Sequence, residues 1–223
     1  MKAQGAVFKV ALAAGKHIGF AYGIPIEQSS WGPLGQSLMV LPCLYVVESA
    51  TSQGAGKALL TAIEQDALTA RFHGTVVTGY RDAQGAEWFM PASFFQPLGY
   101  APVDIQGRAV LLWKPFSPKA VPPHFLQPHF VFKPMDGVVV VDLFWNAFCL
   151  TSVIEAERVR EVCSEFSDRV VLREYQAEDR DVLLQHQVAR GIYIDGKEVG
   201  WGFEAPKDGL REAIARALRA NDT

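Results

Sequence analysis

A proline-rich segment near the middle of the chain limits what the chain can fold into. From Pro115 to Pro134 the sequence reads PFSPKAVPPHFLQPHFVFKP, in which six of twenty residues are proline. A continuous helix or central strand is not expected there, because proline lacks a backbone N–H and fixes φ. The four phenylalanines of the segment would be costly to leave in water. We therefore expect a semi-rigid connector, residues 115–134, that packs on one or both of its neighbours.

The charge balance changes across this connector. Residues 1–114 carry 8 Lys and Arg against 7 Asp and Glu, whereas residues 135–223 carry 11 against 17. A length of 223 residues is compatible with one or two domains. The charge shift favours two, at 1–114 and 135–223. The net charge of −3 and the lack of a long basic run predict no nucleic-acid partner.

Composition also excludes several other classes of protein. No apolar stretch approaches 18 residues and the N-terminus is too polar for a signal peptide, so we expect no membrane association. Cys43, Cys149 and Cys163 have no metal-binding spacing and are odd in number. These features predict a cytoplasmic protein without a metal site or disulfide framework.

The first half contains a strand, a glycine-containing loop and a helix in succession. Residues 38–47 form an apolar run typical of a buried strand, and apolar residues recur at helical spacing within 57–70. Gly54 and Gly56 lie in the loop between them and permit close approach of the backbone. The N–H groups at a helix start lack partners and attract anions, so the loop could hold a phosphate. A plain strand-to-helix turn remains the alternative, because the spacing is neither a P-loop nor a dinucleotide motif.

Motifs in the first half resemble those of the GNAT N-acetyltransferases. Leu44-x-Val46 followed by Thr51-Ser-Gln-Gly-Ala-Gly-Lys-Ala-Leu-Leu60 is similar to motif A of that family. A strand candidate at 75–79, the segment 88–100 and a closing strand at 110–114 follow in the family's order. The resemblance implies an α/β (α+β) fold with a GNAT-like mixed sheet over about residues 6–114.

The resemblance also implies acetyl-coenzyme A (acetyl-CoA) as co-substrate and no metal. Backbone groups of two strand residues would pair with the pantetheine arm, and the loop and helix start would hold the pyrophosphate. The implied binding residues are Val46, Val47, Thr51, Ser52, Gln53, Gly54, Ala55, Gly56 and Lys57. An amine would attack the thioester directly while a base removes its proton and an acid protonates the thiolate.

The catalytic groups and the acceptor site differ from the family pattern. Phe95 stands where the family often has a tyrosine that serves as general acid. Tyr100 lies nearby in sequence and is the candidate acid, with aromatic packing as the alternative role. Glu48 and Glu27 are the candidate bases, with a solvated charge as the alternative for each. Few residues precede the first strand, so a partner subunit or the second domain would have to recognise the small-molecule or peptide amine. The shortened sheet would leave an unpaired edge, which predicts a homodimer.

The second half shows the order strand, helix, strand, helix, strand, strand, helix. Asp195-Gly196 is a hairpin signal between its last two strands. This order resembles the thioredoxin-like fold, over about residues 137–220, and with the first half resembles the YoaP-like group. Cys149 falls at the first redox position of that fold, but Ser152 replaces the second cysteine. A possible thiol site at Cys149 and a scaffold or substrate-recognition role are therefore both open.

These observations predict an acetyl-CoA-dependent N-acetyltransferase fused to a thioredoxin-like, YoaP-like domain. A non-catalytic acyl-CoA-binding module is one alternative, supported by Phe95 and the short N-terminus. A monothiol protein working through Cys149 is the other.

Overall fold

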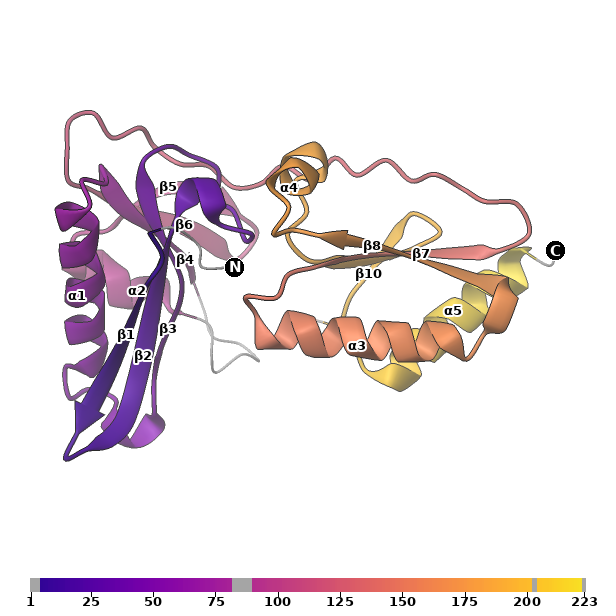
Figure 1. Ribbon diagram of the computed structural model, residues 1–223, viewed down its shortest axis with the longest axis horizontal. Helices are drawn as coiled ribbons and strands as arrows, with labels where there is room; N and C mark the ends of the chain where they lie inside the picture. Colours follow the sequence, from indigo (N-terminus) through magenta and orange to yellow (C-terminus); the bar gives the residue numbers. More distant parts are fainter. Residues whose placement is uncertain (1–4, 82–89, 202–203, 222–223) are drawn as a thin grey trace. The chain divides into compact units, whose positions relative to one another are not determined.

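The computed structural model describes residues 5–81, 90–201 and 204–221, and Figure 1 shows its elements. The chain forms two compact units, 1–126 and 127–223. The boundary between them lies inside the proline-rich segment, between Leu126 and Gln127. Within the described residues, no helix is long and apolar enough to cross a membrane.

The first unit is built on a mixed six-stranded sheet in the order β1-β2-β3-β4-β6-β5. The neighbours β3 and β4 run parallel, and every other neighbouring pair is antiparallel. The strands are β1 (Val7–Ala13), β2 (Lys16–Pro25), β3 (Leu38–Val46), β4 (Gly74–Tyr80), β5 (Ala101–Gln106) and β6 (Ala109–Pro115).

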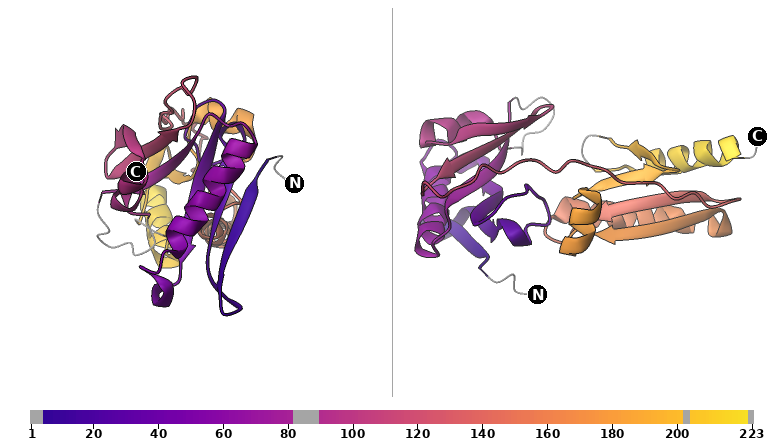
Figure 2. Two further views of the ribbon diagram at one scale, coloured as in Figure 1. Left: turned by 90° about the vertical axis from the view of Figure 1, so that its left-hand side faces the viewer. Right: turned by 90° about the horizontal axis from the view of Figure 1, so that it is seen from above.

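Helix α1 (Ala55–Thr69) covers one face of this sheet (Figure 2, left). Leu59, Leu60, Ile63 and Ala67 are its buried residues, at the spacing that the sequence predicted. They pack with Met39, Leu41 and Val77 of the two parallel strands, among others. The short α2 (Ala92–Phe95) and the 3₁₀ turns η1 (Ile26–Gln28), η2 (Glu48–Ala50) and η3 (Gln96–Leu98) complete the unit.

The first part of the proline-rich segment covers part of the opposite face. Phe125 is 8% exposed and packs with Val40, Val76 and Leu111. Its backbone N–H donates to the Asp104 carboxylate at 2.8 Å. This part of the segment therefore belongs to the core of the first unit.

The second unit has a four-stranded sheet in the order β10-β9-β7-β8. Strands β7 and β8 are parallel, and the β7–β9 and β9–β10 pairs are antiparallel. The elements are β7 (Val139–Trp145), α3 (Leu150–Ser164), η4 (Ser167–Arg169), β8 (Val170–Gln176), α4 (Arg180–His186), β9 (Gly191–Ile194), β10 (Lys197–Val199) and α5 (Lys207–Asn221). The predicted order of strands and helices is confirmed.

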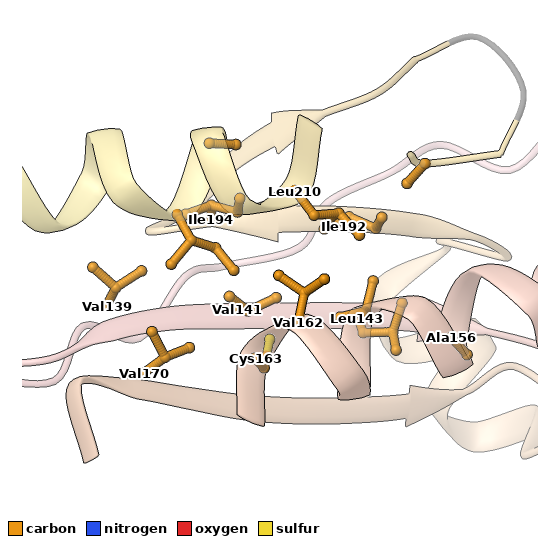
Figure 3. Packing of buried hydrophobic residues seen from close by; sticks show 14 of the residues in the cluster. Val139, Val141, Leu143, Ala156, Val162, Cys163, Val170, Ile192, Ile194 and Leu210 are labelled. Atoms are coloured by element: carbon orange, nitrogen blue, oxygen red, sulfur yellow. The ribbon is translucent and has the colours of Figure 1, made fainter. Parts of the chain in front are cut away.

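Side chains of β7 alternate between the two faces of this sheet. Val139, Val141 and Leu143 pack against α3 and α5, as Figure 3 shows for Val162 and Leu210. Asp142 and Phe144 point to the other face, where Phe144 contacts the ring of Phe130 from the proline-rich segment. This second part of the segment therefore contributes to the core of the second unit.

The sequence prediction missed or misplaced several element boundaries. Strand β5 was not predicted, because Pro102 and Asp104 interrupt its apolar pattern. The apolar pattern predicts a helix over 178–189, but α4 is shorter: Asp179 caps its start by accepting N–H groups of Asp181 and Val182, and it ends at His186. The pattern also predicts a last strand from Glu198 to Phe203; β10 ends at Val199, and Phe203 lies outside the described residues.

Candidate functional site

The parallel strands β3 and β4 separate halfway along their length. They pair from Leu38 opposite Gly74 to Leu41 opposite Val77, and the pairing stops there. At this point β3 contains a bulge, in which Leu41 and Pro42 together face Gly23 of β2. Pro42 has no N–H to donate to a neighbouring strand. The sheet is therefore open along the last residues of β3.

The backbone of β3 presents polar groups to this opening. Val47 N–H donates to the Ile18 carbonyl at 2.9 Å, and its carbonyl accepts the Ala50 N–H at 2.9 Å. Because successive residues of a strand direct their N–H groups to opposite edges, Val46 N–H points away from β2. Of the two predicted pantetheine partners, Val46 is directed to the opening, whereas both backbone groups of Val47 already have partners within the protein.

The loop after β3 is held by its own hydrogen bonds. The Thr51 N–H and hydroxyl both donate to the Glu48 carbonyl, at 3.1 and 2.8 Å. The Gln53 side-chain amide donates to the Ser49 carbonyl at 3.0 Å. The side chains of Thr51 and Gln53 therefore stabilise the loop itself, because both donate hydrogen bonds to backbone carbonyls within it.

Helix α1 begins at this loop without a side-chain cap. Gly54, its N-cap residue, has a φ of +84°, which glycine adopts without strain. The N–H groups of Ala55, Gly56 and Lys57 have no acceptor one turn earlier in the helix. The helix dipole adds positive potential at the same place. The start of α1 can therefore receive an anionic group such as a phosphate.

A pocket of about 450 Å³ lies where the open end of β3, this loop and α2 meet. One wall is polar and consists of the loop and the start of α1; the facing wall is apolar and includes Met90 and Phe94. Gly56 lets the two walls approach, because a Cβ there would lie 3.2 Å from Phe94 Cζ. Of the predicted binding residues, the pocket is lined by Val46, Thr51, Ser52, Gly54, Gly56 and Lys57, and the other three, Val47, Gln53 and Ala55, do not line it.

The apolar wall is the part of the pocket that the sequence prediction missed. Residues 88–95 are rich in aromatic residues, a pattern more typical of core packing than of a binding site, yet Met90 and Phe94 line the pocket. Phe95 also lines it while being fully buried. Trp88, in the same predicted motif, lies outside the described residues. The spacing of Phe94 from the loop in sequence gave no signal that they meet.

The two candidate bases lie in different places. Glu48 is exposed at the start of η2, directly after the open end of β3, although it does not line the pocket. Glu27 instead accepts the Ser37 N–H at 2.6 Å, just before β3 begins. Glu27 is therefore at the opposite end of β3 from the pocket, and its role as a base stays a prediction. Its carboxylate stabilises the turn before β3, where Ser37 has a positive φ.

Tyr100 lies in the core of the first unit and not in the pocket. The residue is 3% exposed, and its hydroxyl lies 2.7 Å from the hydroxyl of the buried Thr75. Its ring packs edge-on against Phe95. Burial raises the pKa of the Tyr100 hydroxyl far above its ordinary value. Tyr100 therefore packs in the core away from the pocket, and its role as a catalytic acid stays a prediction.

The three cysteines have different surroundings. Cys149 is half-buried at the N-cap of α3, and Ser152, in the first turn, accepts the Asn146 N–H at 3.1 Å. Cys163 faces the core, where burial raises the pKa of its thiol to about 12. Cys43 lies in the apolar run 38–47, which predicts a buried side chain, but it is half-buried. No cluster of three or more metal-ligating side chains occurs among the described residues.

No protein-family model and no curated protein matches the chain. Among solved structures, the match to PaiA N-acetyltransferase from Thermoplasma acidophilum in complex with coenzyme A has 20% identity, covers 50% of this chain and 61% of that one, and has a TM-score of 0.40. The match to an acetyltransferase from Bacillus cereus ATCC 14579 has 19% identity, covers 50% of this chain and 73% of that one, and has a TM-score of 0.38. The match to Ard1 from Thermoplasma volcanium has 18% identity, covers 48% of this chain and 69% of that one, and has a TM-score of 0.37. This chain spans about three fifths of the first structure's length.

Proposed function

We propose that the first unit binds acetyl-CoA and transfers its acetyl group to an amine. The observation that carries this proposal is the opening between β3 and β4, which ends at a helix start with unpaired N–H groups. An extended arm can add to the free edge of β3 while a pyrophosphate lies on the start of α1. The pocket joins these two features in one place.

Named residues of the chain fit the parts of such a co-substrate. The Val46 N–H can donate to an amide of the pantetheine arm, and backbone N–H groups from Ser52 to Gly56 can hold the pyrophosphate. Lys57 is exposed and adds a positive charge beside them. Met90 and Phe94 supply an apolar wall that excludes water from the arm. The bound thioester would supply the acetyl carbonyl that the amine attacks.

In this proposal the protein contributes mainly by holding the two reactants together. Such positioning alone can account for a large share of a rate enhancement. Glu48 is retained as the candidate base, because it follows the open end of β3 directly. The acceptor would be a small-molecule or peptide amine.

A non-catalytic acyl-CoA-binding module is the alternative, and one observation favours it. The residue at the position of the family's acid is Phe95, and the nearby Tyr100 hydroxyl is held in the core by Thr75. Neither can protonate a departing thiolate. Turnover with a panel of amines separates this alternative from the enzyme.

For the second unit we propose a thioredoxin-like fold. The parallel β7–β8 pair, the antiparallel β9 and β10 and the helix that follows β7 support this assignment. Cys149 is the N-cap residue of α3 and is half-buried. A monothiol role through Cys149 is therefore the second alternative, and Cys149→Ser, assayed for thiol reactivity and coenzyme A binding, tests it.

The binding proposal is tested by calorimetric titration with acetyl-CoA, with free coenzyme A and ATP as controls. Binding of the first two with micromolar affinity, but not of ATP, is expected. The matched variants Gly54→Val and Gly107→Val then locate the site. Both glycines have positive φ, +84° and +58°, and open space where a Cβ would lie, but Gly107 is in the β5–β6 turn.

Both substitutions are expected to cost stability by about 1–2 kcal/mol through backbone strain. Gly54→Val is also expected to weaken coenzyme A binding by about tenfold or more, because the N–H groups of the loop shift from their positions. Gly107→Val should leave the affinity unchanged. Equal affinities in the two variants would contradict the assignment of the loop.

A further inference from the structure

The first sheet carries a row of apolar side chains on the face turned away from α1. Register places Phe8 opposite Tyr22, Val10 opposite Phe20, and Phe20 opposite Tyr45. Their neighbours in sequence, such as Val7 and Ala11, pack in the core beneath α1. We call this surface the outer aromatic face; its members are Phe8, Val10, Leu12, Phe20, Tyr22 and Tyr45.

The rings of this face contact one another, and those of Phe8 and Tyr45 are exposed to solvent. Ring centroids lie 5.8 Å apart for Phe8 and Phe20, and 5.9 Å apart for Phe20 and Tyr45. Phe8 is 63% exposed, Leu12 60%, Tyr45 46% and Val10 43%. Single exposed apolar residues are ordinary on a protein surface, whereas the largest contiguous apolar group on a protein is often functional.

The rest of the same sheet face is covered, which makes the exposed part distinct. Phe125 packs with residues of β3, β4 and β6, whereas Phe8, Val10, Leu12 and Tyr45 are each more than 40% exposed. Strand β1 is also an edge strand, paired with β2 alone in the described chain. Its charged residue, Lys9, turns to the α1 side and pairs with Asp66 at 2.6 Å. The edge therefore lacks the outward charges that usually prevent association.

We infer that a second copy of this chain packs on the outer aromatic face, related to the first by a two-fold axis. None of the six side chains carries a charge at neutral pH, so the face offers nothing complementary to a nucleic acid, an anionic lipid surface or a charged peptide. An identical neutral face is complementary to it, because a two-fold axis brings the same patch of both subunits together.

The exposed area agrees with what such a dimer needs. At about 200 Å² per large side chain, the four most exposed residues present about 400 Å². Two copies would bury about 800 Å² of apolar surface. Since homodimer interfaces are about 65% apolar, this corresponds to an interface of about 1,200 Å², the lower end of the standard size. The dimer is therefore expected to dissociate on dilution.

The interface would border the pocket, because Tyr45 belongs to the outer aromatic face and also lines the pocket. The second copy would then supply residues beside the open end of β3, where the described chain offers few groups to recognise an acceptor. The inference concerns association alone and does not depend on the proposed acetyl transfer. A chain that stays monomeric would refute this inference, whereas a chain that does not bind coenzyme A would refute the proposed function.

The test is sedimentation velocity of the full chain over a range of concentrations, for the wild type, three variants of the face and one control variant. Phe8→Glu and Leu12→Glu place a charge in the face, and Phe8→Ser removes the ring without adding a charge. The control is Ile105→Glu on β5, the other edge strand, where Ile105 is 53% exposed. Circular dichroism and thermal melts verify that all variants fold.

A concentration-dependent dimer is expected for the wild type and for Ile105→Glu. Phe8→Glu and Leu12→Glu should raise the dimer dissociation constant by about tenfold or more, because a charge would be buried without a partner. Phe8→Ser should raise it by a smaller factor. A wild-type chain that stays monomeric at about 200 µM overturns the inference. A dimer that Ile105→Glu disrupts while the Phe8 and Leu12 variants do not overturns it as well.

Discussion

At the scale of single residues, the pair of hydroxyls from Tyr100 and Thr75 determines what Tyr100 does. Both side chains are buried, and one hydrogen bond of 2.7 Å joins their hydroxyls. A tyrosine held in this way contributes to stability, because removing either hydroxyl deprives the other buried hydroxyl of this bond. Its raised pKa keeps it neutral, so its contribution is fully present below about pH 10 and is lost only at higher pH.

We therefore expect Tyr100→Phe to lower the free energy of unfolding by about 1–2 kcal/mol and to leave coenzyme A binding unchanged. Thr75→Val is the matched variant and should cost a similar amount. The double variant should cost less than the two single changes together, because they remove the same hydrogen bond. Urea unfolding measures these values. Turnover that falls in Tyr100→Phe with no change in stability would instead support a catalytic acid.

The sequence predicted the backbone part of the candidate site better than its side chains. The strand-loop-helix pattern and Gly54 indicated where a helix begins and which backbone groups are unpaired, since these depend on local propensity. The roles of Glu27 and Tyr100 depend on Ser37 and Thr75, which lie 10 and 25 residues away in sequence. No local pattern specifies such contacts, so the two side chains could not be placed.

At the scale of elements, strand β7 carries a carboxylate into the interior of the second unit. Asp142 is fully buried; one carboxylate oxygen accepts the Tyr175 hydroxyl at 3.1 Å, and the other has no partner among the described residues. Burial is the main cause that raises the Asp142 pKa above its ordinary value. Folding therefore favours the protonated form, and the stability that this form provides is present at low pH and lost as pH rises through the raised pKa.

We expect Asp142→Asn to become more stable relative to the wild type as pH rises from about 4 to 8, because asparagine cannot ionise. Burial is the main cause that lowers the pKa of His186, so the stability that this residue provides changes with pH in the direction opposite to that of Asp142. His186 is present in both proteins. Asp168→Asn, at an exposed carboxylate of the same unit, is the control and should show no such trend. Urea unfolding at a series of pH values measures the difference. A difference that does not change with pH would contradict the assignment.

The sequence predicted a strand correctly where a single apolar pattern covers it. The prediction failed where local residue preference and tertiary strand pairing oppose each other. The run from Val138 to Phe144 is apolar at nearly every position and predicts a buried strand, and β7 begins and ends within one residue of that run. Strand β5 exists because its residues pair with β6, although Pro102 and Asp104 are poor strand formers. The tertiary pairing overrides the local preference there, and one sequence alone does not contain that information.

At the scale of the whole molecule, the first part of the proline-rich segment packs on the first unit and the second part packs on the second unit. Phe125 is buried in the first unit, and Phe130 packs in an aromatic cluster of the second with Phe144 and Tyr193. The N–H of His129 donates to the His186 carbonyl at 3.1 Å. A composition that predicted a connector thus corresponds to two short pieces, each of which completes the core of its own unit.

This division predicts how far the first unit can be shortened. A chain ending at residue 126 keeps Phe125, its hydrogen bond to Asp104 and the pairing of His124 with Leu34, so it should unfold in one cooperative transition. A chain ending at residue 114 loses all three and should be less stable by about 3–5 kcal/mol, the usual cost of emptying a buried phenylalanine site. Urea unfolding of both shortened chains measures the loss of stability.

In the full chain, Phe125→Ala should reproduce most of this loss, whereas Val121→Ala, at a residue 57% exposed, should cost little. Equal stability of the two shortened chains would mean that the first unit ends before the segment begins.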